Sequence, residues 1–322
     1  MAASTEKSSA VVSTSDREIV VTRVFDAPRE LVWEAFTDPA QVVLWWGPQG
    51  FTTTIHEMDV RPGGVWRHTM HGPDGTDYPN KSAFIEVVKP ERIVYSHGGG
   101  KKGGPGVQFE ATWSFEARGD KTALTVRQVF PSAEVRERII REFVAVEGAR
   151  QTMGRLAEHL AKNEFTISRA FDAPRELVWQ AFTDPEHMKQ WWGPKGVKVI
   201  ASRMDLRPGG TYHYGMQTPD GHEMWGKFVY REIAPPERLV LVNSFSDKDG
   251  NLTRHPMSPA WPLEMLSVFT FTEQQGKTVV TIRWSPLNAS EQERKTFAES
   301  HASMQQGWTG TFEQLAAYLA TA

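Results

Sequence analysis

The stretch "FDAPRELVWEAFTDPAQVVLWWGPQG" begins at Phe25, and "FDAPRELVWQAFTDPEHMKQWWGPKG" begins at Phe171. A near-identical stretch that returns after 146 residues indicates a repeat, and each repeat has the length of one ordinary domain. The full length of 322 residues also exceeds what one hydrophobic core usually serves. We therefore expect a disordered tail over residues 1–16, a first domain over 17–162 and a second over 163–322.

Each copy is expected to begin with a strand and to continue into two short helices. In the first copy, "REIVVTRVF" (Arg17–Phe25) alternates in polarity as a strand does. Asp26 is the expected N-cap of the first helix and Asp38 that of the second, and Asp172 and Asp184 hold the same places in the second copy. The second helix is expected to end where Gly-Pro follows a pair of tryptophans.

The rest of each copy alternates strand-like segments with turn signals. The turn signals "RPGG", "PDG" and "PER" occur in this order in both copies. They separate six expected strands in the first copy, at residues 52–60, 65–71, 81–88, 92–97, 107–117 and 121–129. Apolar residues then recur at helical spacing up to the end of each copy. The pattern predicts an α+β fold in which a curved antiparallel sheet wraps one long C-terminal helix.

These motifs together carry a family resemblance. "FDAPRELVW", "AFTDP", "WWGP", "RPGG", "PDG" and "PER", in this order and twice, resemble bacterial members of the family named after the activator of the 90-kDa heat-shock protein ATPase. That family belongs to the START-like (SRPBCC, Bet v 1-like) helix-grip superfamily. The resemblance covers about residues 18–162 and 164–322 and implies two tandem helix-grip domains. It also implies a deep pocket between sheet and long helix, which different members use for hydrophobic small molecules or for cyclase and hydrolase chemistry.

Composition narrows the function classes. A formal net charge of −3 gives no basic field for nucleic acid or for an anionic membrane surface, so neither partner is expected. The absence of cysteine excludes disulfides and thiolate chemistry and fits a cytoplasmic protein, as does the small, polar N-terminal segment. No phosphate loop, dinucleotide fingerprint or Gly-x-Ser-x-Gly elbow occurs, so no cofactor is expected.

The strand after "RPGG" provides the first candidate site residues. On a strand, alternate residues share a face. The face expected to point inward carries Trp66, His68 and Met70 in the first copy and Tyr212, Tyr214 and Met216 in the second. His68 and Tyr214 would then be matched polar groups in an apolar pocket, able to donate a hydrogen bond to a ligand carbonyl or phenol. The alternative is that both are core residues whose polar atoms meet the backbone.

Large side chains elsewhere complete the expected pocket wall. In each tryptophan pair, either both indoles seal the core or the second one faces the pocket. The further ligand-binding candidates are Trp46, Tyr95, Trp113, Trp192, Trp261, Trp284, Met304 and Trp308. Trp261 belongs to a Pro-rich insertion, Ser246–Met265, that the first copy lacks. Arg283 either lies on the solvated face or, beside Trp284, would suit an anionic ligand.

Histidines raise two further possibilities. His301 falls on the apolar stripe of the last helix, where it is either a general base facing the pocket or a core or rim residue. His68 and His71 form an H-x-x-H, but residues three apart on a strand point to opposite faces, so we expect no metal site.

Three functions remain open. The leading expectation is a tandem protein that binds a hydrophobic or aromatic small molecule in one or both domains, as a monomer by default. The second is a cofactor-independent cyclase or hydrolase in which His68, Tyr214 or His301 polarises or deprotonates the ligand. The third is a co-chaperone of a heat-shock ATPase, and we expect it least, because members with that role carry a separate N-terminal domain where this chain has a short tail.

Overall fold

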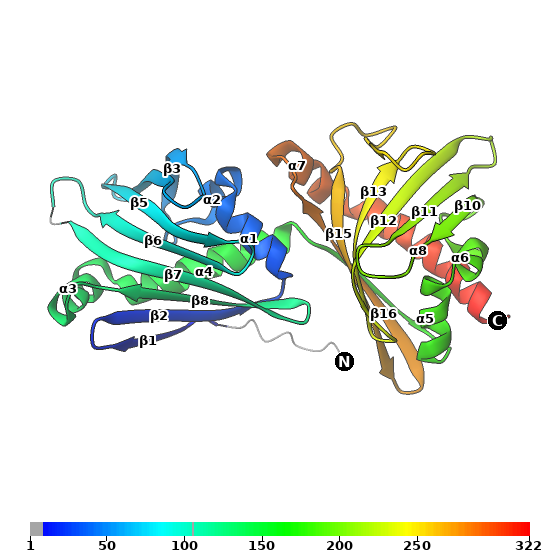
Figure 1. The fold of residues 1–322 in the computed structure, drawn as a ribbon, viewed down its shortest axis with the longest axis horizontal. Coiled ribbons are helices and arrows are strands. Elements are labelled where there is room, and N and C mark those ends of the chain that lie inside the picture. Colours follow the sequence, from blue (N-terminus) through cyan, green and yellow to red (C-terminus); the bar gives the residue numbers. More distant parts are fainter. Residues whose placement is uncertain (1–8, 105) are drawn as a thin grey trace. The chain divides into compact units, whose positions relative to one another are not determined.

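The structure is a computed structural model that describes residues 9–104 and 106–322. The chain divides into two compact units, Met1–Lys162 (unit 1) and Asn163–Ala322 (unit 2), and each has its own sheet and its own core. Each unit combines one antiparallel sheet with helices, so the expected α+β class is confirmed (Figure 1). No helix within the described ranges is long and apolar enough to cross a membrane.

Unit 1 contains all six strands expected between residues 52 and 129. Its sheet has the order β1-β2-β8-β7-β6-β5-β4-β3, a meander with the N-terminal strands beside the last strand. The elements are β1 (Val11–Ser15), β2 (Glu18–Phe25), α1 (Arg29–Thr37), α2 (Pro39–Trp45), β3 (Thr52–Met58), β4 (Val65–His71), β5 (Asp77–Val88), β6 (Arg92–Gly99), β7 (Val107–Arg118), β8 (Lys121–Val129), α3 (Ala133–Phe143) and α4 (Ala145–Lys162).

Unit 2 repeats the plan in the order β10-β11-β12-β13-β15-β16-β9, with a short strand of the insertion, β14, paired to β13. Its elements are β9 (Phe165–Phe171), α5 (Arg175–Thr183), α6 (Pro185–Trp191), β10 (Lys198–Met204), β11 (Thr211–Gln217), β12 (Glu223–Ala234), β13 (Arg238–Ser246), β14 (Leu252–Thr253), β15 (Glu264–Gln274), β16 (Lys277–Leu287), α7 (Glu291–Glu299) and α8 (His301–Leu319).

The prediction of a disordered tail over residues 1–16 was wrong for Val11–Ser15, which form strand β1. Strand β1 pairs with β2 through a two-residue turn, in which Asp16 has a φ of 39°. An aspartate with positive φ suits a tight hairpin turn, and β1 covers what would otherwise be an open sheet edge. Residues 1–8 of the expected tail lie outside the described residues.

The predicted N-cap residues are confirmed at the second helix of each unit but not at the first. Asp38 accepts a hydrogen bond from the Ala40 N–H at 2.9 Å, and Asp184 caps α6 in the same way. The expected caps at Asp26 and Asp172 were wrong, because α1 and α5 begin directly after a proline that occupies the cap position without a side-chain bond. The proline sets the starting φ, so no side-chain cap is needed to define these helix starts.

The long C-terminal helix expected in each unit is present as α4 or α8, but part of the apolar pattern that predicted it belongs to a separate helix before it, α3 or α7. Val144, with a φ of 47°, separates α3 from α4, and Ser300 separates α7 from α8. After the break, α4 and α8 each run along the inner face of their sheet (Figure 1). Register shifts at Phe84/Glu86 and Tyr230/Glu232 bend the two sheets at matched places. The helix-grip arrangement is therefore confirmed, and the helix that each sheet wraps, α4 or α8, is shorter than the sequence pattern indicated.

In each tryptophan pair, the first residue lies in the core and the second lines a cavity. Trp45 and Trp191 are fully buried, and each donates its indole N–H at 2.9 Å to a carbonyl of the preceding helix, that of Ala35 or Ala181. These bonds fix the second short helix on the first. The next residue in each unit turns the other way and lines a cavity.

The loop after each tryptophan pair is tied to the last helix. In unit 1, the Arg155 guanidinium donates to the carbonyls of Gly47, Pro48 and Phe51 at 3.0 Å and to that of Leu44 at 3.3 Å. In unit 2, Gln314 reaches only the carbonyls of Trp191 and Gly193. A cation that collects several carbonyls binds more strongly than a neutral amide.

We expect Arg155→Leu to destabilise unit 1 by ~2 kcal/mol, because it leaves several loop carbonyls without their charged donor. Gln314→Leu, the matched change in unit 2, should cost ~1 kcal/mol. Hydrogen exchange measured on peptides from each unit separates the two effects. Equal losses in the two units would contradict the proposed difference between the clamps.

Candidate functional site

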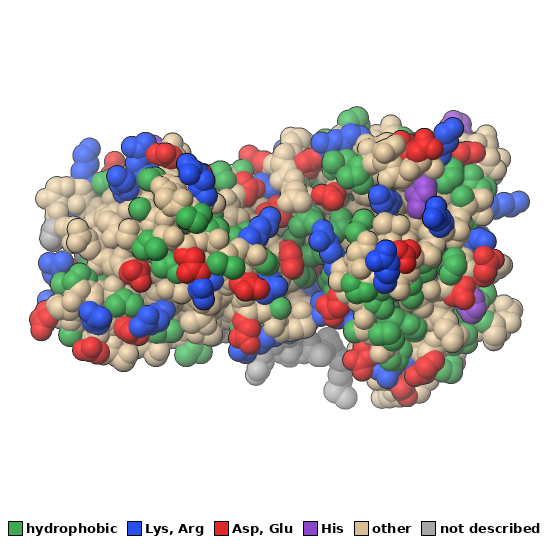
Figure 2. All heavy atoms as spheres, in the orientation of Figure 1, with side chains coloured by type: hydrophobic (Ala, Val, Ile, Leu, Met, Phe, Trp, Pro, Cys, Tyr) green, Lys and Arg blue, Asp and Glu red, His purple; other side chains and the backbone are tan. Residues whose placement is uncertain are grey.

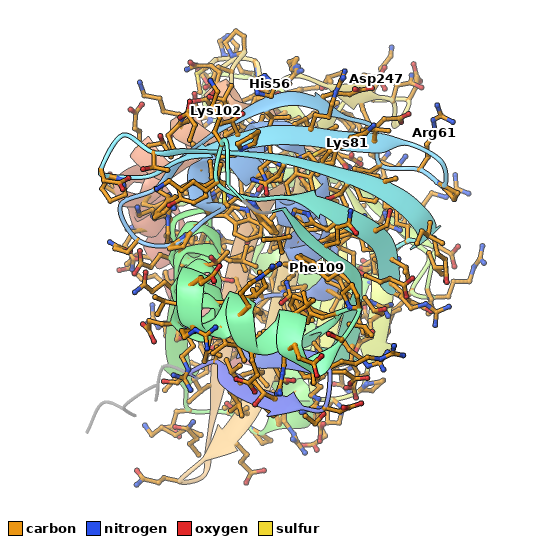
Figure 3. All side chains as sticks on the ribbon, turned by 90° about the vertical axis from the view of Figure 1, so that its left-hand side faces the viewer. His56, Arg61, Lys81, Lys102, Phe109 and Asp247 are labelled. Carbon is orange, nitrogen blue, oxygen red and sulfur yellow. The ribbon has the colours of Figure 1, made fainter. Side chains whose placement is uncertain are left out.

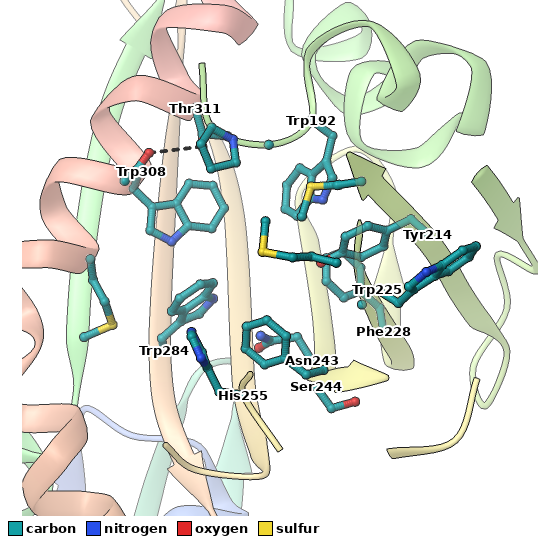
Figure 4. A pocket seen from close by; sticks show the side chains of 18 of the residues that line it. Trp192, Tyr214, Trp225, Phe228, Asn243, Ser244, His255, Trp284, Trp308 and Thr311 are labelled. Carbon is teal, nitrogen blue, oxygen red and sulfur yellow. Dashed lines mark hydrogen bonds between the residues drawn. The ribbon is translucent and has the colours of Figure 1, made fainter. Parts of the chain in front are cut away.

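Each sheet and its last helix enclose a cavity. Cup 1, in unit 1, has a volume of about 230 Å³ and is lined by the loop after α2, by strands β2 and β4–β8, and by α3 and α4. Cup 2, in unit 2, has a volume of about 310 Å³ and is lined by the loop after α6, by β11–β13 and β16, by the insertion and by α8 (Figure 4). The residues that line either cup include no Asp, Glu, Lys or Arg.

Most of the candidate residues line the cups. Those in cup 1 are Trp46, His68, Met70 and Trp113, and those in cup 2 are Trp192, Tyr214, Met216, Trp261, Trp284, Met304 and Trp308. The second tryptophan of each pair thus faces the cavity, as one of the two interpretations of the pair required. Their role in binding stays a prediction.

Three candidates lie in the core instead of on a cup wall. Trp66 and Tyr212 are fully buried, because the beginning of their strands packs beneath the helix pair and only the later residues reach the cup. The Trp66 ring meets Phe36 of α1 edge to face at 5.9 Å. The Tyr95 hydroxyl is buried and accepts a hydrogen bond from the Trp113 indole at 3.1 Å. The expectation that these three line a pocket is therefore corrected.

His301 is corrected as well, since it does not line cup 2. It is the first residue of α8, one turn before Met304, and its ring packs edge to face against Phe165 and Phe297 at 5.7 and 5.2 Å. Burial lowers the pKa of His301. His301 directly follows the helix break at Ser300, which a continuous helical stripe in the sequence did not reveal.

A tryptophan–histidine pair defines the polar chemistry of cup 1. The Trp46 indole N–H donates to His68 Nε2 at 3.2 Å. Burial lowers the pKa of His68 to about 3, with His97 and His56 adding to the effect. His68 is therefore neutral near pH 7, and because an indole is only a donor, the single imidazole proton resides on Nδ1. That Nδ1 is buried and meets no partner.

A second histidine, His97, lines cup 1. His97 bonds to the Ser82 hydroxyl at 3.0 Å and stacks on Phe109 with ring centroids 4.4 Å apart. Burial lowers the pKa of His97 to about 4. Figure 3 shows Phe109 between the sheet and the helices, while Lys81 and Lys102 lie on the outer side. Cup 1 thus holds two neutral imidazoles and no charge on its wall.

Cup 2 replaces this chemistry at the same strand positions. Tyr214 stands where His68 does, Asn243 where His97 does, and Trp284 where Gln128 does. Burial raises the pKa of Tyr214, so the phenol stays protonated at physiological pH. Figure 4 shows the Tyr214 side chain directed into the cavity, opposite the indoles of Trp284 and Trp308.

One glycine makes room for the tyrosine. A Cβ on Gly226, the cross-strand partner of Tyr214, would lie 2.4 Å from the tyrosine hydroxyl oxygen. In unit 1 the same place holds Asn80, opposite the smaller His68. The exchange of His68 for Tyr214 is therefore coupled to the exchange of Asn80 for Gly226. The sequence analysis did not identify Asn80 or Gly226 as site residues. A glycine in the middle of a strand is the signal that could have indicated a close approach.

Two further glycines shape the cups from the helix side. Gly148 of α4 and Gly307 of α8 both line their cup, and each accepts a hydrogen bond from the threonine four residues later, Thr152 or Thr311. A Cβ on Gly307 would meet nothing within 4 Å. Sequence reasoning missed these residues too, although an isolated glycine in a helical pattern usually has a packing reason.

The insertion of unit 2 closes one side of cup 2. It places His255 and Trp261 on the wall, and Trp261 packs on Phe297 of α7 at 5.8 Å between ring centroids. Arg254 of the insertion also forms an ion pair with Glu293 of α7. The insertion is thus anchored to the helix that precedes α8.

The positions of Arg283 and of the two histidines of the H-x-x-H bear on the remaining candidates. Arg283 pairs with Glu164 at 2.8 Å and does not line cup 2, so it is not placed to meet an anionic ligand there. His68 faces cup 1 while His71 turns outward and bonds to Asp77 at 2.7 Å. Among the described residues, no cluster of three or more His, Asp or Glu side chains could hold a metal ion.

A curved sheet that grips a helix around an uncharged cavity, twice in one chain, defines a tandem of START-like helix-grip domains. The chain belongs to the family described as Activator of Hsp90 ATPase homolog 1-like protein, whose model matches residues 26–161 and 172–320. The two matched segments coincide with the two units. Comparison with curated proteins gives no match.

Solved structures align with one unit at a time. A crystal structure of a Mycobacterium smegmatis protein is 24% identical, covers 47% of this chain and 98% of its own, and has a TM-score of 0.44. A solution structure of an Arthrobacter aurescens protein is 25% identical, with coverages of 47% and 91% and a TM-score of 0.44. A Nitrosomonas europaea protein is 25% identical, with coverages of 50% and 96% and a TM-score of 0.41.

The coupled exchange can be tested by transplanting cup 2 chemistry into cup 1. We expect His68→Tyr alone to destabilise unit 1 by ~1–3 kcal/mol through overpacking against Asn80. Adding Asn80→Gly should restore most of that loss, measured by urea denaturation with Asn80→Gly alone as the control. If the double variant is no more stable than the sum of the two single changes, the residues are not coupled.

The two buried imidazoles of cup 1 predict that the stability of unit 1 depends on pH. Below pH 6.5 the unfolded chain protonates His68 and His97 while the folded unit does not, so the free energy of unfolding falls as pH decreases towards 4. The loss reaches ~1.4 kcal/mol per pH unit for each imidazole. His97→Asn, which installs the residue of unit 2, should reduce the slope by about half. Hydrogen exchange by peptide, corrected for intrinsic pH dependence, reads the units separately, and a slope that the variant leaves unchanged contradicts the assignment.

Proposed function

We propose that each unit binds an apolar or aromatic small molecule in its cup. The observation that carries this proposal is the wall itself: both cups are lined by aromatic and aliphatic side chains with a few neutral polar groups and no formal charge. Such walls are typical of ligand pockets for apolar molecules. Lys, Arg, Asp and Glu side chains are instead interspersed over the outer surface, as Figure 2 shows for one face.

The sizes of the cups suit small ring compounds. A cavity of roughly 150 Å³ is enough for benzene. Cup 1, at about 230 Å³, and cup 2, at about 310 Å³, therefore suit molecules of more than one ring. Because their walls differ at three polar positions, we expect the two cups to prefer different ligands.

Binding is favoured over catalysis by the protonation states of the candidate groups. A general base works best with a pKa near the working pH, and burial takes the pKa of His68 down to about 3 and raises that of Tyr214. His301, the third catalytic candidate, does not line cup 2. The shared internal cups likewise favour ligand binding over the ATPase activation in the family's name.

The proposal predicts two independent binding sites for a neutral aromatic probe such as naphthalene. Gly148→Phe should fill cup 1 and Gly307→Phe cup 2, because both glycines line their cup and a Cβ on either would make no contact shorter than 3.4 Å. We expect isothermal titration calorimetry to find two sites in the parent chain, one in each variant and none in the double variant.

Both changes replace a helical glycine, so they should not weaken their helices. Thermal unfolding confirms that each variant remains folded, and hydrogen exchange shows which unit the probe protects. Binding that survives unchanged in the folded double variant would place the site outside the cups and overturn the proposal.

A further inference from the structure

We propose that cup 2 selects neutral ligands that carry a carbonyl oxygen, which accepts a hydrogen bond from the Tyr214 hydroxyl. The inference rests on the proposed function, because it names the class of ligand for one of the two cups. It also separates the cups, since cup 1 has no hydroxyl at the matching position.

The first argument concerns the direction of the hydrogen bond at Tyr214. The Trp192 and Tyr214 rings meet edge to face at 5.8 Å between centroids, and among the described residues the phenol proton has no acceptor. A phenol hydroxyl can donate as well as accept, so its proton is available to a ligand. The Tyr214 side chain is directed into cup 2 (Figure 4). A ligand there therefore meets a donor.

The second argument concerns the rest of the wall. Asn243, which lines cup 2 on a nearby strand, accepts a hydrogen bond from the Ser267 hydroxyl at 2.6 Å through its carbonyl oxygen. Its amide N–H groups then remain as a second set of donors in the same cup. Tyr214 and Asn243 thus offer donors to a ligand in cup 2, and a ligand without an acceptor leaves them unpaired. The Thr311 hydroxyl donates to the Gly307 carbonyl and is not one of these donors.

The third argument concerns charge. No Lys, Arg, Asp or Glu lines cup 2, so a carboxylate would lose its hydration without gaining a cationic partner. An ammonium group would likewise lose its hydration without gaining an anionic partner. A neutral ketone, aldehyde, ester or amide satisfies Tyr214 at no such cost. Its rings would lie against Trp284 and Trp308, which meet edge to face at 5.3 Å between centroids.

At the matching position, cup 1 has an imidazole N–H in place of a hydroxyl. The Nε2 of His68 accepts from Trp46, and its protonated Nδ1 is buried without a partner. The hydroxyl at Tyr214, and the space that Gly226 leaves for it, are therefore features of cup 2. This asymmetry makes a clean test possible within one chain.

The test compares two isosteric probes, 2-acetylnaphthalene and 2-isopropenylnaphthalene, which differ by a carbonyl oxygen in place of a methylene carbon. Both are titrated by calorimetry into the full chain with cup 1 filled by Gly148→Phe. We expect cup 2 to bind the ketone about tenfold more tightly, equivalent to ~1.4 kcal/mol. Tyr214→Phe should bring the ratio close to one while leaving hydrocarbon binding in place.

Tyr212→Phe is the matched control, because Tyr212 stacks on Tyr214 at 5.1 Å but its hydroxyl lies in the core, within 3.4 Å of Ser202. It should leave the ratio at about tenfold. The infrared carbonyl stretch of the bound ketone gives an independent readout. It should shift to lower frequency in the parent protein and return towards its value in apolar solvent with Tyr214→Phe.

The outcomes separate the two proposals. If neither probe binds, the proposed function fails at cup 2. If both bind equally well in the parent chain, or if Tyr214→Phe retains the tenfold ratio and the shifted carbonyl stretch, ligand binding stands and the selectivity for carbonyl compounds is overturned.

Discussion

The fold of each unit depends on one buried hydrogen bond, from the first indole of the tryptophan pair to a carbonyl of the preceding helix. Trp45 and Trp191 are fully buried and donate at 2.9 Å to Ala35 and Ala181. A buried indole needs such a partner, and here the partner fixes how the second short helix sits on the first. The following tryptophan is thereby turned towards the cavity, so the same constraint that closes the core also builds a cup wall.

The sequence predicts the frame of this protein better than its cavities. The repeat, the strand order and the second helix cap follow from local signals that short-range physics decides, such as turn residues, alternation and Asp38 before a proline. Val144 and Ser300 break the last helix although neither is a typical helix breaker, because tertiary packing decides there. Strand alternation likewise indicated the inward face of β4 but could not show that Trp66 lies under α1 while His68 reaches the cup.

The sequence does not show whether an inward-facing strand residue lies under the helices or on the cavity wall. Residues two apart share a face, yet one packs beneath a helix pair and the next lines a cavity, and only the three-dimensional position of the helices distinguishes them. The same holds for His301, whose helical spacing matches that of Met304 but whose position lies beyond the end of cup 2. Glycines are the hardest of these residues to recognise from the sequence. Gly226 and Gly307 contribute to the cavity by having no side chain, and a missing side chain leaves no periodic pattern in the sequence.

The two units therefore differ by sets of exchanges that only make sense together. A tyrosine at position 214 requires the glycine at 226, and this pair gives cup 2 a hydroxyl that stays neutral. A histidine at position 68 permits Asn80 and gives cup 1 a buried imidazole whose folded form resists protonation. Tyr214 with Gly226 adds a ligand contact that does not change its protonation state near neutral pH. His68 with Asn80 makes the free energy of unfolding of unit 1 depend on pH. The two cups thus differ in the polar groups that they offer a ligand, and in cup 1 that polar group also makes the stability of the unit depend on pH.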